Sequence, residues 1–359
     1  MSTNRRLTRN KRLLTIGASI VAMGTLASCA SSGGGDADGQ TTITVLGYTA
    51  IFEDNFTQAV IEGFEAQHPE YNVEYVPSQN SAEMLGKLRS EASNPTVDVA
   101  ILDQSVANTG IQEGVFAQLD EAAVPNLANV VDMGLNAEGY GPAMTFDNLV
   151  LLVNPEEAPE EISSIQDLWD APDNSVAIPA APDIQGIALT ALTANNLGAD
   201  YQEDIQPAID ELALLQPKVT SWDPQPDVYQ TVTSGSAQYA VGWNARGQVF
   251  SDQSDGRLQV VQPDDGIAFQ VNTINMVEGT ENAEGAQAFI DYTLSKESQE
   301  SFSSAMFYAP TVKNAELPEE VQARVADPQD PNIVEIDWIW MADQRDAWTD
   351  LWRRTVIGG

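Results

Sequence analysis

The apolar positions that follow residue 41 alternate between the spacing of strands and the spacing of helices. Three short segments are rich in β-branched or apolar residues and predict strands: Thr42–Gly47, Tyr71–Val76 and Val97–Leu102. Between the first two, Phe56, Val60 and Phe64 recur at helical spacing. Asn80 and Glu83 form a capping-box pattern that predicts the start of a second helix. This strand–helix–strand–helix–strand order predicts a parallel α/β sheet with covering helices.

A second alternating stretch runs from about residue 149 to residue 243. Val176–Pro179 and Tyr239–Trp243 predict strands, and Gln185–Asn196 predicts a helix. Trp222–Pro226 is rich in proline and predicts a loop. Two consecutive helices and a last tryptophan-rich helix are predicted later in the chain: Ala283–Leu294, Lys296–Ala305 and the segment with Trp338, Trp340, Trp348 and Trp352. We expect these four tryptophans in the core or at its rim.

Two pairs of residues directly follow predicted strands of the first stretch. Tyr48 and Thr49 follow the first strand, and Asp103 and Gln104 follow the third. Open α/β sheets bind ligands in the crevice beyond the carboxyl ends of their strands. These four residues are therefore candidates for a binding site.

The first 28 residues have the pattern of an export signal. Five cations precede the apolar run Leu13–Leu26: Arg5, Arg6, Arg9, Lys11 and Arg12. The run is too short for a membrane-spanning helix, which needs roughly 20 residues. The tetrapeptide that ends at Cys29 resembles a bacterial lipobox, which implies cleavage after residue 28 and a lipid on Cys29. Residues 29–41, rich in Gly, Ser and Asp, predict a flexible tether.

The cysteine count and the net charge exclude a disulfide and disfavour some classes of partner. Cys29 is the one cysteine, so no intrachain disulfide can form. The formal net charge is −37, and loss of the five cations of the signal leaves −42. Such a surface disfavours nucleic acid and anionic lipid as partners.

The residue types that catalysis needs are scarce. His68 is the one histidine, which excludes Ser-His-Asp and Cys-His arrangements and histidine-rich metal sites. No phosphate-binding or dinucleotide-binding glycine motif is present. We therefore expect no enzyme, no metal and no cofactor. A secreted hydrolase with a pair of carboxylates remains the alternative class, because 53 acidic residues provide many pairs.

Several fragments, in this order, resemble the extracellular solute-binding proteins of ABC importers. The resemblance lies nearest to the branch that includes spermidine/putrescine-, ferric-iron- and thiamine-binding proteins. The fragments span nearly the whole chain after the tether: residues 61–71, 97–102, 140–154, 234–244, 286–299 and 308–311.

The resemblance implies a two-lobed periplasmic-binding-protein-like α/β fold with mixed, mostly parallel sheets. Two hinge crossings would join the lobes and let them close on a solute. We expect lobe 1 in residues 42–146 plus 245–305 and lobe 2 in residues 147–244 plus 306–359. The implied protein is a monomer on the outer side of the cell membrane. It is held there through the lipid alone and delivers solute to ABC permease and ATPase subunits.

The resemblance also implies ligand-binding positions. Polyamine-binding members hold methylene chains between aromatic walls and ammonium ends with carboxylates. Trp243 and Trp222 match such walls, Asp183 matches a carboxylate, and Asn244 follows Trp243. The leading expectation is therefore a polyamine such as spermidine or putrescine. No adjacent tyrosine pair is present, which argues against ferric iron.

Arg246 departs from the polyamine pattern. Where polyamine binders have an acid shortly after this tryptophan, the sequence has Ala245 and Arg246. The arginine could form a structural ion pair, neutralise Asp183 or Asp103 in an empty cleft, or bind a carboxylate or phosphonate of the solute. The last possibility favours an amino-acid-derived, opine or aminophosphonate zwitterion, which remains the alternative ligand class.

Overall fold

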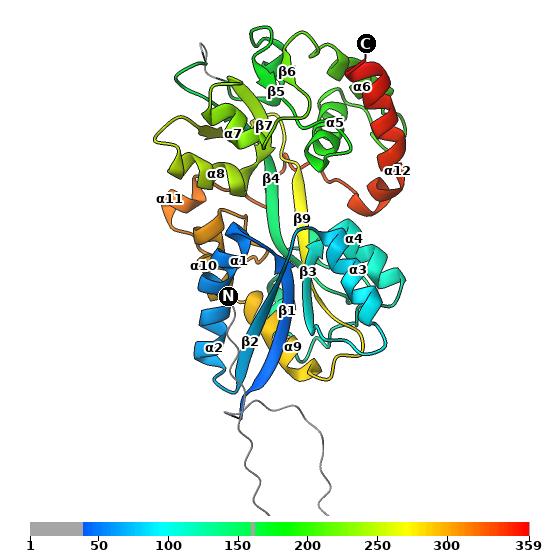
Figure 1. Ribbon diagram of the computed structural model, residues 1–359, viewed down its shortest axis with the longest axis vertical. Helices are drawn as coiled ribbons and strands as arrows, with labels where there is room; N and C mark the ends of the chain where they lie inside the picture. The colour runs from blue at the N-terminus through cyan, green and yellow to red at the C-terminus, as the bar shows by residue number, and fades with distance from the viewer. Residues whose placement is uncertain (1–38, 159–161, 359) are drawn as a thin grey trace, which may run out of the picture. The chain divides into compact units, whose positions relative to one another are not determined.

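The computed structural model describes residues 39–158 and 162–358. The predicted signal peptide, Cys29 and all but the last three residues of the predicted tether lie outside the described residues. The described part contains one mixed sheet in the order β2-β1-β3-β9-β4-β7-β5-β6, with β8 paired to β4 (Figure 1). The strands are β1 Thr41–Tyr48, β2 Tyr71–Ser78, β3 Val99–Asp103, β4 Ala143–Val153, β5 Val176–Ala177, β6 Val219–Ser221, β7 Tyr239–Trp243, β8 Gln259–Val261 and β9 Phe269–Met276.

Helices cover both ends of this sheet. The first half contributes α1 Ile51–Phe56, a π-helical turn η1 Thr57–Ile61, α2 Glu62–Gln67, α3 Ser81–Glu91, α4 Gln104–Gln112 and α5 Ile184–Asn196. The second half contributes α6 Gln206–Ala213, α7 Val228–Thr233, α8 Asn244–Gln253, α9 Ala283–Thr293, α10 Lys296–Met306, α11 Glu319–Gln322, α12 Trp338–Leu351 and η5 Trp352–Val356. The predicted alternation of strands and helices is confirmed. At the predicted capping box, the Asn80 side chain accepts a hydrogen bond from the Glu83 N–H at 2.9 Å.

β4 and β9 connect the two groups of strands (Figure 1). Residues 143–148 of β4 pair antiparallel with β9, whereas residues 149–153 pair with β7 and β8. β9 pairs with β3 through its second half. β1 runs parallel to its two neighbours, β2 and β3. β5 likewise runs parallel to β6 and β7. The expected α/β fold with two crossing strands is therefore confirmed.

The return crossing runs along β9, a strand that the sequence analysis did not predict. The strand that ends at Trp243, β7, makes no crossing: it pairs with β4 and β5 only, and α8, which follows it, packs on β4, β7 and β8. The expected lobe boundaries stay a prediction.

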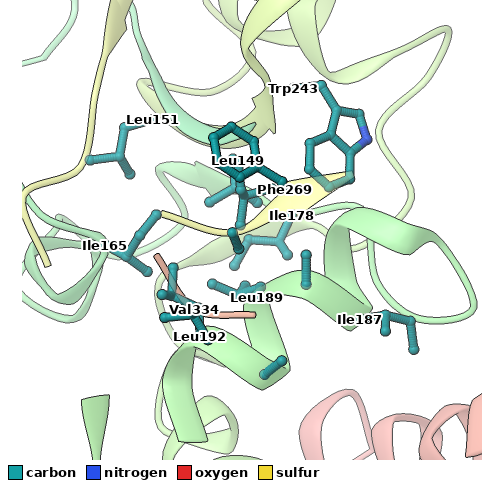
Figure 2. Close-up of a cluster of buried hydrophobic side chains, with 14 of the residues drawn as sticks. Leu149, Leu151, Ile165, Ile178, Ile187, Leu189, Leu192, Trp243, Phe269 and Val334 are labelled. Carbon is teal, nitrogen blue, oxygen red and sulfur yellow. The ribbon is translucent and has the colours of Figure 1, made fainter. Parts of the chain in front are cut away.

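Separate apolar cores lie on either side of the crossings. One surrounds β1, α1, α2, α9 and α10 and includes the fully buried Phe56, Phe64 and Phe289. The other surrounds the second half of β4, α5 and α12. Figure 2 shows Trp243 with Leu149 and Phe269 in this second core. Burial of such side chains contributes roughly 1.5–3 kcal/mol each, and the two cores hold the strand ends between them in fixed positions.

Candidate functional site

A cavity of ≈ 540 Å³ lies beside β4 and β9. Its walls come from the end of β1, the middle of both crossing strands, the start of α5, α7, the start of α8 and the segment after α10. A second cavity of ≈ 320 Å³ shares Asp183, Ile184 and Gln270 with the first and extends to α3, α4 and α12. These volumes lie in the range of small-molecule sites.

Asp147 is one of the two acids that line the larger cavity. It lies on β4 within an eleven-residue strand whose residues are all buried. Its Oδ1 accepts a hydrogen bond from the Ala245 N–H at 2.9 Å, at the start of α8. Burial raises the pKa of Asp147 to about 7, although this bond, the nearby Arg246 charge and the Asn244 N–H act in the opposite direction. The carboxyl group therefore titrates near neutral pH.

Arg246 brings a positive charge to the same cavity. It lies in the first turn of α8, and its side chain is exposed while its neighbours Ala245 and Gly247 are buried. The guanidinium carbon lies 5.8 Å from the centroid of the Tyr229 ring. Within the described residues no carboxylate forms a salt bridge with Arg246. Its fork of N–H donors therefore remains available to a solute.

Aromatic side chains surround these two charges. Tyr229 on α7 is buried, and its hydroxyl accepts the Trp243 N–H at 2.9 Å, which joins α7 to the end of β7. Trp243 is 8% exposed and Tyr308 is half-buried. Burial and the Asp147 charge raise the pKa of both the Tyr229 and the Tyr308 hydroxyl groups, which stay neutral at physiological pH. These rings form apolar walls with polar tips.

Asp183 is the N-cap of α5. Its Oδ1 accepts a hydrogen bond from the Gln185 N–H at 2.8 Å, which satisfies one of the free N–H groups of the first turn. Burial raises the pKa of Asp183, and the Gln185 bond and the Arg345 charge oppose that rise. Arg345 of α12 donates from Nε and Nη2 to the Pro182 carbonyl oxygen at 3.0 and 2.6 Å. The loop that carries Asp183 is thereby fixed to α12.

The last residues of β1 and β3, Tyr48 and Asp103, line the larger and the smaller cavity respectively. Asp103 accepts hydrogen bonds from the Ser81 hydroxyl and from Gln270 Nε2, both at 2.8 Å. The Tyr48 hydroxyl lies 2.7 Å from Ser81 Oγ and donates to Asn272 Oδ1 at 3.0 Å. This network joins β1, β3, α3 and β9. Both oxygens of the Asp103 carboxylate accept hydrogen bonds from the protein itself.

Most of the residues singled out from the sequence line one of the two cavities. Those that do are Tyr48, Thr49, Asp103, Gln104, Asp183, Trp243 and Arg246. Asn244 and Trp222 line neither. Asn244 is buried and donates to the carbonyl oxygens of Phe307 and Arg324 at 2.8 and 2.9 Å. Trp222 packs edge-on against Trp352 with ring centroids 5.7 Å apart. Their binding roles, like those of the lining residues, stay predictions.

Several lining residues were missed by the sequence analysis, above all Asp147, Gln185 and Tyr229. A usable signal existed for Asp147, because it is a charged residue inside a long apolar segment, and such buried charges need a specific environment. Gln185 lies in α5, a helix that is buried from Gln185 to Ala194, and Tyr229 lies in the six-residue helix α7. Neither side chain is charged, so neither gives a comparable signal.

The described residues contain neither a metal site of acidic, histidine or cysteine side chains nor a helix that could span a membrane. Within residues 39–158 and 162–358, no group of three His, Cys, Asp or Glu side chains could hold a metal ion. In the same residues, no helix is long and apolar enough to cross a bilayer.

Comparison with known proteins agrees with this architecture. Residues 59–331 match the family described as bacterial extracellular solute-binding protein. A spermidine/putrescine-binding periplasmic protein of Haemophilus influenzae is 24% identical over 68% of this chain and 69% of its own length. A gamma-aminobutyric acid-binding protein of Pseudomonas aeruginosa is 23% identical over 78% of this chain and 80% of its own.

Solved structures show the same fold. An ABC transporter protein of Clostridium perfringens superposes with a TM-score of 0.73 at 28% identity and covers 88% of this chain and 99% of its own. A spermidine/putrescine ABC transporter substrate-binding protein of Streptococcus pneumoniae gives 0.72 at 17% identity, with coverage of 88% and 98%. The chain therefore belongs to the bacterial extracellular solute-binding protein family and is a solute-binding protein of ABC import.

Proposed function

We propose that this protein captures a small zwitterion that has a carboxylate at one end and an ammonium group at the other, in the size range of γ-aminobutyrate. The observation that carries this proposal is Arg246, whose guanidinium group faces the cavity without an ion pair among the described residues. A guanidinium fork matches a carboxylate with two parallel hydrogen bonds. The protein binds this solute and releases it chemically unchanged.

The acids of the cavity account for the other end of the solute. Asp183 lies on the α5 side of the cavity, and its charge, like those of Asp147 and Arg246, acts on the Tyr229 hydroxyl. One tyrosine is thus within electrostatic reach of two acids and one base. An ammonium group at Asp183 and a carboxylate at Arg246 would satisfy both signs of charge within one cavity.

A polyamine such as putrescine or spermidine was the leading expectation from the sequence, and it fits this charge pattern less well. The aromatic walls and Asp183 suit an ammonium end. A diamine would however leave Arg246 unpaired and add a like charge beside it, which costs affinity. The two curated relatives bind, by name, spermidine/putrescine and gamma-aminobutyric acid, so relatives at similar distance exist for both solute classes.

The membrane arrangement is part of the proposal. The cationic start, the short apolar run and the tetrapeptide that ends at Cys29 support cleavage after residue 28 and a diacylglyceryl group on Cys29. One lipid group with two chains gives durable attachment. The protein would act as a monomer on the outer side of the membrane and pass solute to its permease and ATPase subunits. Mass spectrometry of the N-terminal peptide from membranes should show lipid-modified Cys29, and an unmodified thiol there would exclude the anchor.

Calorimetry with four probes tests the ligand class. The probes are γ-aminobutyrate, putrescine, octopine and 2-aminoethylphosphonate, each followed by recovery of the probe. We expect γ-aminobutyrate to bind more tightly than putrescine and to be recovered intact. At a concentration of about 100 times its Kd, it should add about 2.7 kcal/mol to the free energy of unfolding. Tighter binding of putrescine would overturn the zwitterion proposal, and release of the chromophore from an added chromogenic glycoside would favour the hydrolase alternative.

A further inference from the structure

The smaller cavity adjoins the larger one at the start of α5. It has a volume of ≈ 320 Å³ and is lined by residues of α3, α4, α5 and α12, of which α12 and α4 contact each other (Figure 1). The exposed Asp183 lines both cavities, together with Ile184 and Gln270. An ammonium group at Asp183 would therefore lie at the border of the two cavities. A substituent on its nitrogen would extend into the smaller one.

Arg345 gives the smaller cavity a positive charge. It is exposed, lies on α12 and lines the smaller cavity but not the larger one. Its Nε and Nη2 donate to the Pro182 carbonyl oxygen. A guanidinium group has five N–H donors, so further donors remain for a ligand. Within the described residues no carboxylate forms a salt bridge with Arg345, and its charge opposes the rise that burial causes in the pKa of Asp183.

The charges that remain for a solute alternate in sign across the two cavities. Asp103, the other acid of the smaller cavity, already accepts protein hydrogen bonds at both of its oxygens. The pKa of Asp147 is raised by burial to about 7, so part of this carboxyl group is uncharged at neutral pH. Arg246 in the larger cavity, Asp183 at the border and Arg345 in the smaller cavity then give the order positive, negative, positive. The complementary solute has a carboxylate, an ammonium group and a second carboxylate in that order.

We infer that the smaller cavity is a subsite for a second carboxylate, and that the preferred solute has a secondary ammonium group flanked by two carboxylates. N-carboxyalkyl amino acids have this arrangement. One carboxylate pairs with Arg246, the ammonium group with Asp183, and the second carboxylate with Arg345. A secondary ammonium group keeps its charge and two N–H donors, so its pairing with Asp183 is retained. This inference rests on the proposed function, because it keeps the first carboxylate and the ammonium group where that function places them.

Calorimetry on the full chain with three probes tests the subsite. The probes are γ-aminobutyrate, N-methyl-γ-aminobutyrate and N-(carboxymethyl)-γ-aminobutyrate. We expect the wild-type protein to bind the carboxymethyl probe more tightly than the N-methyl probe by roughly 10- to 100-fold, the range for hydrogen bonds to a charged group. The N-methyl probe has the substituent without its charge and should bind no more tightly than γ-aminobutyrate.

Arg345→Gln should bring the affinity ratio of the carboxymethyl and N-methyl probes close to one. Arg345 also fixes the loop that carries Asp183, so this variant should weaken all three probes by a common factor as well. A purely structural role would produce that common factor and leave the ratio unchanged. Arg353→Gln, which removes an exposed arginine elsewhere on the surface, should leave the ratio as in the wild type.

Ala82→Leu tests the same subsite without a change of charge. Ala82 is exposed, lies in the first turn of α3 and lines the smaller cavity only. A leucine there takes up space in the subsite and should lower the affinity ratio, while γ-aminobutyrate binds as before. Ala92→Leu, at the exposed end of the same helix and outside both cavities, is the matched control and should change neither. Circular dichroism establishes that each variant is folded, and Ala82→Leu carries the test if Arg345→Gln does not fold.

The outcomes separate the two proposals. A wild-type ratio of about one, or a ratio that folded Arg345→Gln leaves unchanged, overturns the subsite and leaves zwitterion binding intact. Failure of the wild-type protein to bind any of the three probes overturns the proposed function and this inference with it.

Discussion

Replacement of Asp147 by asparagine should stabilise the protein by an amount that depends on pH. Burial raises the pKa of Asp147 from the ordinary value of 3.8 to about 7. Between these values the folded protein binds a proton more tightly than the unfolded chain, so the free energy of unfolding falls as the pH rises. Each pKa unit is worth 1.36 kcal/mol, which gives a penalty of about 4 kcal/mol above pH 7. The uncharged amide of the Asp147→Asn variant would escape this penalty, while its oxygen keeps the bond from the Ala245 N–H.

Urea unfolding at several pH values measures this effect without any ligand. We expect the stability of Asp147→Asn relative to wild type to increase from about pH 4 to about pH 7 and to stay constant above it. Asp132→Asn is the control, and its stability relative to wild type should change little between about pH 4 and about pH 7, because the pH dependence of Asp132 lies below its ordinary pKa of 3.8. Its exposed carboxylate is paired with Lys313, whose hydrogen bond lowers the pKa of Asp132. A stability difference for Asp147→Asn that does not change with pH would refute the reasoning about its burial.

Three further substitutions, two of them with a matched control substitution, test the site and its supports. Arg246→Gln should weaken the binding of a carboxylate-bearing solute by roughly 10- to 100-fold in calorimetry and should strengthen the binding of putrescine, because a like charge beside the diamine is removed. Arg353→Gln on the exposed surface should change neither affinity; equal effects on both solutes would make Arg246 structural. Gly186→Ala should lower stability and solute affinity together, because its Cβ would lie 2.5 Å from the Ala181 nitrogen and 2.7 Å from the Pro179 carbonyl oxygen, in the loop before Asp183. Gly86→Ala, with open space at its Cβ, should instead stabilise α3 by about 0.5–1 kcal/mol in urea unfolding; equal behaviour of the two glycine variants would contradict the packing argument. Trp243→Ala should cost about 3–5 kcal/mol of stability as well as solute affinity, because Trp243 belongs to a core and lines the cavity; a loss of affinity at unchanged stability would exclude the core role.

The regular part of the fold could be predicted because hydrophobic spacing dominates there. Phe56, Val60 and Phe64 are all fully buried, as their helical spacing predicts, and β7 is buried throughout. β9 was missed because Asn272, Thr273 and Asn275 interrupt its apolar run. These polar residues are buried, and their side chains form hydrogen bonds to one another and to neighbouring strands. These hydrogen bonds to distant segments allow polar side chains to be buried, and the local sequence pattern does not show them.

The candidate site divides in a similar way. Tyr48, Thr49, Asp103 and Gln104 could be found from strand ends, because α/β sheets bring these ends to one edge. Asn244 follows a strand too, yet its side chain turns into the protein to bond carbonyl oxygens of distant segments. The direction of the Asn244 side chain thus depends on contacts with segments 63 and 80 residues away. No local pattern contains that information.

A crystal structure of the protein with γ-aminobutyrate tests the central claim most directly. The account predicts the solute inside the cavity beside β4 and β9, its carboxylate within hydrogen-bond distance of Arg246 and its ammonium group beside Asp183. A solute bound outside this cavity, or one inside it with the ammonium group at Arg246, would contradict the account.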